Sequence, residues 1–274
     1  MDSQARPFAA HQQAFMDRFV AVCQADQRVV AAFLGGSYVK GTADASSDLD
    51  LTLITTDAAY EDFAARRKEF LGQLGELVFL EDFDQPHSVF FILSDGTEGE
   101  IWLGGERHLD HVHSGPYQVL IDTKSILADA VFPEDAPIQA EQIETLRRLL
   151  TWFWHDLSHF TTAMARDQLW WAHGQLEGLR RYCVQLARLR HNFAVSADGY
   201  DKLDLALPVE QLSPLQASYC QQEYGAMLQA ADVIVQFYQE LAPLLALTHG
   251  LPYPAGLERV MIDRLEQLSE ERST

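Results

Sequence analysis

The stretch from residue 28 to residue 54 constrains the fold more than any other part of the chain. Residues 29–34 form a short apolar run, as expected of a buried strand, and the run stops at Gly35-Gly36. Residues 48–54 alternate between polar and apolar side chains, which predicts a second strand. Because successive strand side chains point to opposite faces, Asp48 and Asp50 share one face. The sequence therefore predicts two strands connected through a glycine turn, with paired carboxylates beside that turn.

The residue types at this turn suit the binding of a polyphosphate. Glycine lets backbone N–H groups approach an anion closely, and the Ser37 hydroxyl adds another donor. The two carboxylates repel each other unless a hard cation lies between them, and Mg²⁺ with phosphate oxygens in its shell is a common solution. The alternative places Asp48 and Asp50 on the solvent face of an edge strand, although aspartate is disfavoured in strands. A P-loop is excluded, because Lys40 precedes Gly41 where that motif has the reverse order. A nucleoside-triphosphate site is the favoured interpretation.

The spacing of these residues resembles a known motif. The Gly36-Ser37 pair is followed, after ten residues, by Asp48 and Asp50. This pattern is similar to the signature of the nucleotidyltransferase superfamily that shares a palm-like fold with DNA polymerase β. The resemblance implies Mg²⁺-dependent transfer of a nucleoside monophosphate from a nucleoside triphosphate such as ATP to an acceptor, with release of pyrophosphate. It implies that Asp48 and Asp50 hold the metal. The nucleotide contacts it implies are Gly36, Ser37 and Ser47.

A third carboxylate is expected on a neighbouring strand, and Glu100 is the best candidate. It opens a predicted return strand at residues 100–103, after a turn at 94–97. Glu98 is the alternative, but it lies on the turn side of Gly99. Glu100 serves either as a metal ligand or as the general base on the acceptor hydroxyl, and the sequence leaves both roles open. Trp102 shares the face of Glu100 and is a candidate substrate contact.

The chain up to residue 135 fits a small α+β palm with a mixed sheet and helices. Helical periodicity predicts a first helix over residues 6–26, and Asp57 is the expected N-cap of a helix that ends near residue 74. Short apolar or alternating runs predict further strands at 76–80, 88–93, 100–103 and 117–121. We therefore expect residues 1–135 to form a nucleotidyltransferase domain.

Residues 136–274 are expected to form an all-helical bundle that binds the acceptor. Apolar residues recur at three- and four-residue spacing over 143–164, 168–189, 216–247 and 255–269. Tryptophans and acids gather between residues 152 and 171, and an aromatic wall with carboxylates suits an aminated sugar. Asp156 and Asp167 are therefore candidate substrate contacts. The alternative is a set of core tryptophans beside a solvated acidic face.

Composition narrows the class of acceptor. Forty Asp and Glu against twenty Lys and Arg give a net charge of −20, which repels nucleic-acid phosphates. The charge favours a cationic or neutral small acceptor, with plain solubility as the alternative explanation. We expect neither a nucleic-acid partner nor a membrane partner. The three cysteines suit no disulfide or zinc framework, and no signal-peptide pattern is present, so a cytoplasmic enzyme is expected.

Four stretches extend the resemblance over most of the chain, at residues 36–50, 99–103, 121–124 and 166–189. A palm followed by a helical bundle is similar to the bacterial antibiotic nucleotidyltransferases, most of all to the larger lincosamide nucleotidyltransferases. That group often has Asp-Ile-Glu where this chain has Asp-Leu-Asp, whereas aminoglycoside adenylyltransferases use Asp-x-Asp. By family analogy Lys124 lies near the nucleotide phosphates, with an ordinary loop lysine as the alternative. Homodimers are common in the resembled group.

The sequence thus predicts transfer of AMP, or another nucleoside monophosphate, to a hydroxyl of a small antibiotic. A lincosamide is the first expected acceptor, and the net charge keeps an aminoglycoside as the second. A protein-modifying nucleotidyltransferase of the toxin–antitoxin type, acting on Tyr, Ser or Thr of a partner, stays open as a different class. A catalytically silent palm is disfavoured, because it has no use for three costly carboxylates in one place.

Overall fold

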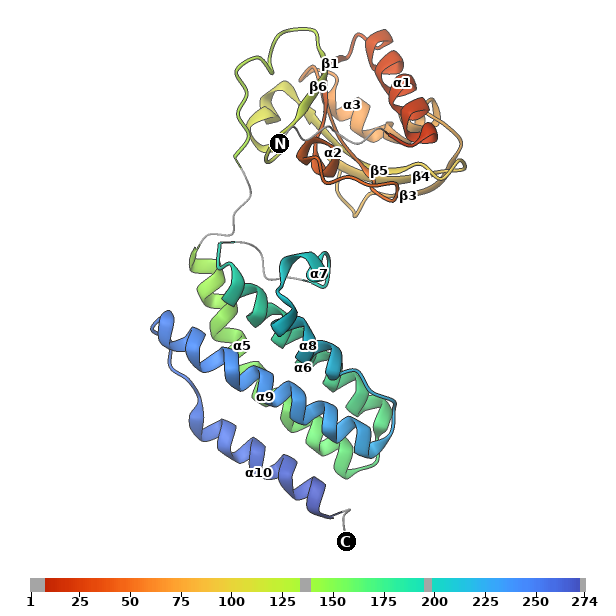
Figure 1. Cartoon of the computed structure of the whole chain (residues 1–274). Coiled ribbons are helices and arrows are strands. Elements are labelled where there is room, and N and C mark those ends of the chain that lie inside the picture. Colours follow the sequence, from red (N-terminus) through yellow and green to blue (C-terminus); the bar gives the residue numbers. More distant parts are fainter. Residues whose placement is uncertain (1–7, 134–138, 195–198, 272–274) are drawn as a thin grey trace. The chain divides into compact units, whose positions relative to one another are not determined.

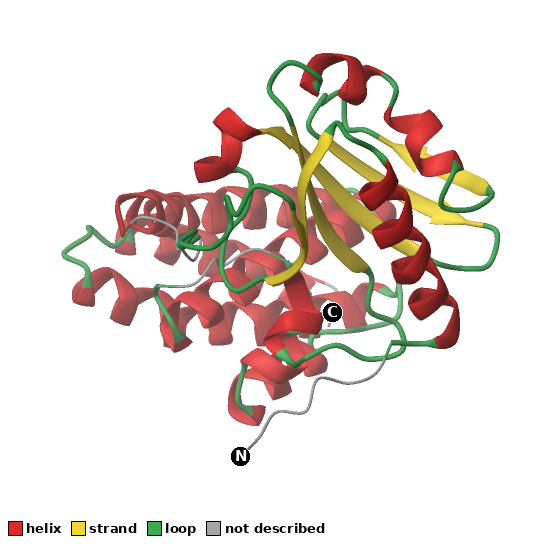
Figure 2. Ribbon diagram, turned by 90° about the horizontal axis from the view of Figure 1, so that it is seen from above, coloured by secondary structure: helices red, strands yellow, loops and turns green. Residues whose placement is uncertain are grey.

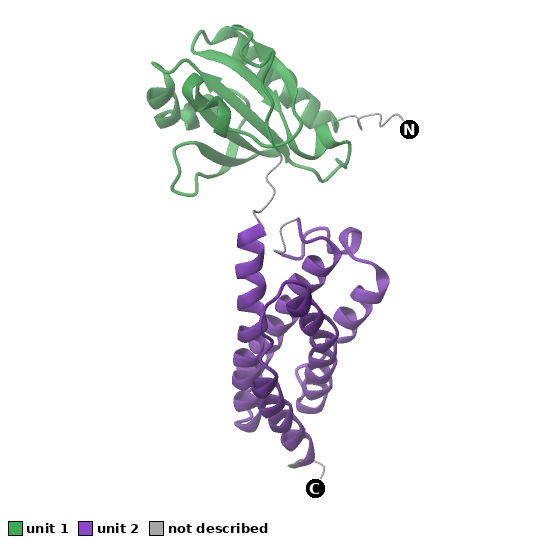
Figure 3. Cartoon of the chain, turned by 90° about the vertical axis from the view of Figure 1, so that its left-hand side faces the viewer, with its two compact units in different colours: residues 1–135 green, residues 136–274 purple. Residues whose placement is uncertain are grey.

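The computed structural model describes residues 8–133, 139–194 and 199–271. The chain divides into two compact units, Met1–Asp135 and Ala136–Thr274 (Figure 3). The first combines a sheet with helices, and the described part of the second is helical, so the predicted α+β fold class is confirmed. No helix within the described ranges has both the length and the apolarity that a membrane crossing needs.

A six-stranded mixed sheet forms the centre of the first unit (Figures 1 and 2). Its strands are β1 (Val29–Leu34), β2 (Leu49–Thr55), β3 (Leu77–Glu81), β4 (Ser88–Leu93), β5 (Glu98–Gly105) and β6 (Gln118–Asp122). They lie in the order β3-β4-β5-β2-β1-β6. The β2–β5 pair is parallel and the other pairs are antiparallel. All strands that the sequence predicted in this unit are present, with ends that shift by a few residues.

One face of the sheet is buried under helices. These are α1 (Ala10–Ala25), α3 (Tyr60–Ala65) and α4 (Arg67–Gly72). The leucines of β2 that alternate with Asp50 point into this core, where they join Phe15 and Phe19 of α1 and Phe63 of α3. The alternation expected for β2 is therefore confirmed, and it leaves Asp50 on the opposite face of the sheet.

The opposite face is only partly covered, by the segment that follows β5. Phe33 of β1 is fully buried there, and its ring lies 5.0 Å from the ring of His113, 5.3 Å from Tyr117 and 5.5 Å from Phe132. The Tyr117 hydroxyl lies 2.9 Å from the Leu127 carbonyl and 2.8 Å from the Ala130 carbonyl, and its single hydrogen can be donated to either. This aromatic cluster holds the parts of the chain before and after β6, residues 106–117 and 123–133, on one half of the face, while the half that carries Asp50 stays open.

The expected helix with its N-cap at Asp57 is wrong in detail. Two short helices, α3 and α4, replace it, and the chain leaves helical geometry at Arg66. The Asp57 carboxylate instead accepts a hydrogen bond from the Arg107 backbone N–H at 2.9 Å, at the start of the 3₁₀ helix η1 (Glu106–His111). The Asp57 side chain therefore bonds to a residue far away in the sequence and does not cap the helix that follows it.

The second unit is an α-helical bundle in its described part. Its elements are α5 (Gln139–Ala165), α6 (Leu169–His191), α7 (Leu203–Ala206), α8 (Val209–Ala217), α9 (Tyr224–Thr248) and α10 (Ala255–Glu271). The core is built around the stacked rings of Phe153 and Tyr238, whose centroids are 3.7 Å apart. The helix predicted over 216–247 starts later than expected, because α8 is a separate helix that ends at Ala217.

Phe33→Ala should loosen the segment that covers the second sheet face. Loss of a buried phenylalanine costs about 3–5 kcal/mol of folding free energy, which denaturant unfolding measures. Hydrogen exchange should rise specifically over residues 112–132. Phe19→Ala is the matched control, because Phe19 is equally buried but belongs to the helix-covered core. Equal protection of 112–132 in both variants would contradict this role of Phe33.

Candidate active site

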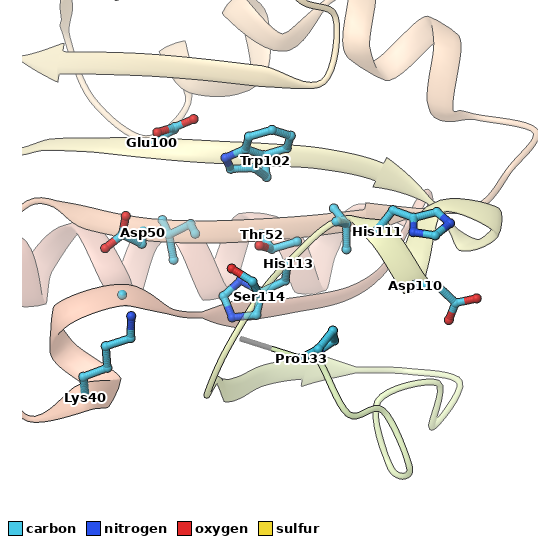
Figure 4. Close-up of a pocket in the computed structure, with 13 residues that line it drawn as sticks. Lys40, Asp50, Thr52, Glu100, Trp102, Asp110, His111, His113, Ser114 and Pro133 are labelled. Atoms are coloured by element: carbon cyan, nitrogen blue, oxygen red, sulfur yellow. The ribbon is translucent and has the colours of Figure 1, made fainter. Parts of the chain in front are cut away.

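Two of the predicted carboxylates lie side by side on the open face of the sheet. Asp50 on β2 is the direct partner of Glu100 on β5 in the parallel register, and adjacent strands are only about 4.8 Å apart. Figure 4 shows both side chains on the same side of the sheet, within one cavity. Asp48 lies one residue before β2, which begins at Leu49 and not at Asp48 as expected. Its charge still acts on Asp50.

The Asp50 carboxylate is in an unfavourable electrostatic setting. Burial raises its pKa above the usual value, and the negative charges of Asp48 and Glu100 raise it further. A backbone hydrogen bond with Ser37 and the charge of Lys40 lower the pKa again, without cancelling the increase. The protein thus keeps three carboxylates together at a cost in stability, which is typical of a functional site.

Glu100 is held in place by a neighbouring strand. The Ser88 hydroxyl on β4 donates a hydrogen bond of 2.5 Å to Glu100 Oε1. A charge-assisted O–H···O bond of this length restricts the rotamers of the glutamate. The carboxylate is therefore positioned on the cavity wall by β4 as well as by its own strand.

The glycine turn fits against Asp50 with no space to spare. The Gly35 N–H donates to the Asp50 carbonyl at 2.8 Å, and Gly36 opens the short helix α2 (Gly36–Lys40) with a φ of +62°. A Cβ at position 36 would lie 1.6 Å from Asp50 Oδ2. Glycine is thus required twice at this position, by the backbone conformation and by the adjacent carboxylate.

The Ser37 hydroxyl has the properties of a ligand contact. Its Oγ is buried, and within the described part of the protein it has no hydrogen-bond partner. A buried hydroxyl without a partner costs free energy, so such an atom is expected where a ligand supplies the bond. This observation agrees with the predicted role of Ser37 in holding a phosphate oxygen.

Two other predicted nucleotide contacts lie elsewhere. Ser47 Oγ accepts a bond from the Asp44 N–H at 2.8 Å, and the Ser47 carbonyl accepts one from Gln12 at 2.7 Å. Ser47 therefore orders the loop that leads to Asp48. The Lys124 ammonium pairs with Glu106 at 2.8 Å, and neither Ser47 nor Lys124 lines the cavity. Their roles in nucleotide binding stay predictions.

The cavity around Asp50 and Glu100 has a volume of about 540 Å³. Its wall contains Gly36, Asp50, Glu100 and Trp102, which were predicted from the sequence, and further polar residues that were not. These are Lys40, Thr52, Asp110, His111, His113 and Ser114 (Figure 4). Lys40 could have been predicted from the sequence, since it follows Ser37 by only three residues. The 110–114 segment could not have been, because it reaches the site only through the packing of Phe33.

The two acidic candidates of the helical unit are placed differently from each other. The Asp156 carboxylate accepts a hydrogen bond from the Tyr182 hydroxyl at 2.7 Å and lies 2.9 Å from His155 Nδ1. Burial and this carboxylate raise the pKa of Tyr182 to about 12. Asp167 is exposed in the turn between α5 and α6, with a φ of +54°. Their contact with substrate stays a prediction.

The residues present suit a magnesium ion that arrives with a nucleotide. Among the described residues, no three His, Cys, Asp or Glu side chains are arranged to hold a metal by themselves. Mg²⁺ commonly takes only one or two protein carboxylates and completes its shell with phosphate oxygens and water. The mutual repulsion of Asp48, Asp50 and Glu100 and the orphaned Ser37 hydroxyl fit such a shared site.

Comparison with known proteins identifies the family. A family model described as streptomycin adenylyltransferase matches residues 10–268. The chain belongs to this family. As a streptomycin adenylyltransferase family member it is a nucleotidyltransferase of the antibiotic-modifying type, with a nucleoside triphosphate as co-substrate. The predicted enzyme class is confirmed, while the predicted closeness to the lincosamide group receives no support.

Two further comparisons add little to this assignment. The solved structure of an aminoglycoside 6-adenyltransferase from Bacillus subtilis aligns with 96% of this chain and 99% of its own, with 15% identity and a TM-score of 0.42. A likeness this weak carries no functional conclusion. No curated protein matches the sequence.

Gly36→Ala should lower the rate of nucleotidyl transfer roughly 100-fold or more by displacing Asp50. A shift of about 1 Å in a reacting group costs roughly 100-fold in rate. Gly96→Ala is the matched control, because Gly96 also has a positive φ (+84°) but open space around its missing Cβ. The control should lose only about 1 kcal/mol of stability through backbone strain and keep its turnover. Turnover assays and thermal melts of both variants measure these effects, and an active Gly36→Ala enzyme would disprove the steric argument.

Proposed function

We propose that the chain transfers AMP from ATP, with Mg²⁺, to a hydroxyl of an aminoglycoside such as streptomycin, and releases pyrophosphate. The observation that carries this proposal is the Asp50–Glu100 pair beside the Gly36-Ser37 turn in a chain of the streptomycin adenylyltransferase family. The net charge of −20 agrees with a polycationic acceptor. A lincosamide, the first expectation from sequence, becomes the second acceptor to test.

The nucleotide phosphates are bound by hydrogen-bond donors that lie on one side of Asp50. Ser37 Oγ and the Gly36 backbone receive the β- and γ-phosphate oxygens, while the backbone N–H groups of Gly35 and Ser37 already bond to Asp50. Lys40 adds a positive charge, and it is the only Lys or Arg among the described residues that line this cavity. Without Lys40, these lining residues would include no lysine or arginine to offset the carboxylates of Asp50 and Glu100.

The chemical step requires the carboxylates in two roles. Asp48 and Asp50 hold the metal, which would neutralise the charge that develops on the transferred phosphoryl group. Glu100, oriented by Ser88, accepts the proton of the attacking hydroxyl. The sequence left open whether Glu100 is a ligand or a base. Its hydrogen bond with Ser88 orients the carboxylate for either role, and we assign it the base because Asp48 and Asp50 already supply the one or two carboxylates that Mg²⁺ commonly takes.

Pyrophosphate release tests the reaction and the acceptor together. The wild-type enzyme should release pyrophosphate with Mg²⁺·ATP and an aminoglycoside, and we expect less or none with lincosamides or with GTP. Asp50→Ala should lose roughly 10³-fold or more, because a metal ion supplies several kcal/mol of transition-state stabilisation. Glu100→Gln should lose about 10²–10⁴-fold as a missing general base. Substantial turnover by folded Asp50→Ala would contradict the site, and silence across the whole panel would contradict the function.

Substitution of two lysines tests which of them contacts the nucleotide phosphates: Lys40, which lines the cavity, or Lys124, which the family resemblance suggests. Lys40→Ala should raise KM for ATP about tenfold, since a lost charged contact costs about 1.5–3 kcal/mol in a site and less where it is exposed. Lys124→Ala should leave KM for ATP unchanged, because its ammonium is paired with Glu106 outside the cavity. Steady-state kinetics with ATP as the varied substrate measures both. The reverse result would place the phosphates at Lys124.

A further inference from the structure

A second cavity of about 240 Å³ adjoins the one that holds Asp50 and Glu100. The two cavities share Trp102, His111 and Val112 in their walls. Rings dominate the wall of the second cavity, and two aliphatic side chains complete it. The rings are those of Tyr60, His87, Trp102, His108 and His111. No carboxylate, lysine or arginine is among these described lining residues, in contrast to the first cavity.

The aromatic wall is built by side chains that position one another. The His87 ring lies 5.0 Å from the Trp102 ring at an interplanar angle of 32°, so the two rings are tilted neighbours. The Tyr60 ring meets His108 edge-on at 4.7 Å, and the Gly105 N–H donates to His108 Nδ1 at 3.0 Å. Four of the five lining rings thus have a ring neighbour within the same wall.

Trp102 connects this cavity to the reacting groups. It lies two residues after Glu100 on β5 and pairs with Thr52, as Glu100 pairs with Asp50. Two residues of a strand span roughly 7 Å. Figure 4 shows the indole between Glu100 and His111, on the same side of the sheet as both carboxylates. Asp50, Glu100 and Trp102 thus form a row of side chains on this face of the sheet. The glycine turn contacts the row at its Asp50 end.

The geometry of phosphoryl transfer indicates which end of this row faces the leaving pyrophosphate and which end faces the acceptor. The attacking and leaving oxygens lie roughly in line with the phosphorus atom between them. The proposed function places the leaving pyrophosphate at Gly36 and Ser37 and the phosphorus atom near Asp50. The acceptor hydroxyl then approaches from the side of Glu100 that is remote from the turn. That side leads to Trp102 and the second cavity.

We propose that the second cavity is an acceptor subsite that binds one uncharged ring, a sugar or cyclitol, by stacking on Trp102. The assignment rests on the proposed function. A volume below the 300–1,000 Å³ of complete ligand sites fits a single ring of a larger molecule. A wall of aromatic and imidazole rings without carboxylates offers faces for ring stacking and hydrogen bonds to hydroxyls. Its described residues include no carboxylate that could pair with an ammonium group. The amines of the acceptor therefore stay outside it, nearer to the acidic first cavity.

Replacement of Trp102 tests the subsite. Trp102→Ala should raise KM for the aminoglycoside by tenfold or more and leave KM for ATP within twofold, and Trp102→Phe should restore most of the acceptor affinity. Phe79→Ala is the matched control, because Phe79 is a 47% exposed aromatic on β3 of the same unit and lines neither cavity. Circular dichroism confirms the fold of each variant. If Trp102→Ala unfolds, His87→Ala replaces it, with an expected rise of about threefold in the same KM.

The outcomes are distinguishable. A raised KM for the acceptor alone supports the subsite. A raised KM for ATP with an unchanged KM for the acceptor would assign the cavity to the nucleobase and overturn the proposal. Unchanged constants for both substrates in folded variants would overturn it as well, while the proposed function stands. Absence of pyrophosphate release by the wild-type enzyme with every acceptor would overturn the proposed function and, with it, the subsite.

Discussion

The parallel pairing of β2 with β5 is the constraint on which the rest of the site depends. It places Asp50 directly beside Glu100 on one face of a sheet, where like charges repel. The alternating leucines of β2 are buried against α1 and α3 on the other face, and this apolar packing offsets the repulsion. Stability and chemistry are therefore divided between the two faces of the same strands.

The glycine turn is fitted to this pair of strands. Gly36 has room for no side chain beside Asp50, and the next residue carries a buried hydroxyl with no partner in the described protein. A short helix then presents Lys40 at the wall of the same cavity. One turn thus brings a hydroxyl without a described partner and a positive charge to the acidic pair, as the proposed binding of a metal-bound nucleotide would require.

The two adjoining cavities differ in chemistry, and this difference suits a two-substrate reaction. The first has carboxylates, one lysine and a glycine backbone, whereas the second has aromatic and imidazole rings. Trp102 belongs to both walls and lies one strand step beyond Glu100. Under the proposed function, charge would select the nucleotide and metal, and ring stacking would orient the acceptor. The strong negative charge of the whole chain favours a cationic acceptor but does not define how it is held.

The sequence by itself determined the strand–turn–strand unit, the paired carboxylates, Glu100 on a neighbouring strand and the change to an all-helical second half. These features follow from local periodicity and glycine placement, which act over a few residues. Only the tertiary structure decided the strand order, the pairing of Glu100 with Asp50 and the diversion of Asp57 to η1. It also decided that His113 enters the site while Lys124 pairs with Glu106. The reason is physical: these contacts join residues far apart in the chain, through buried packing around Phe33 and through hydrogen bonds between strands, and no local pattern encodes them.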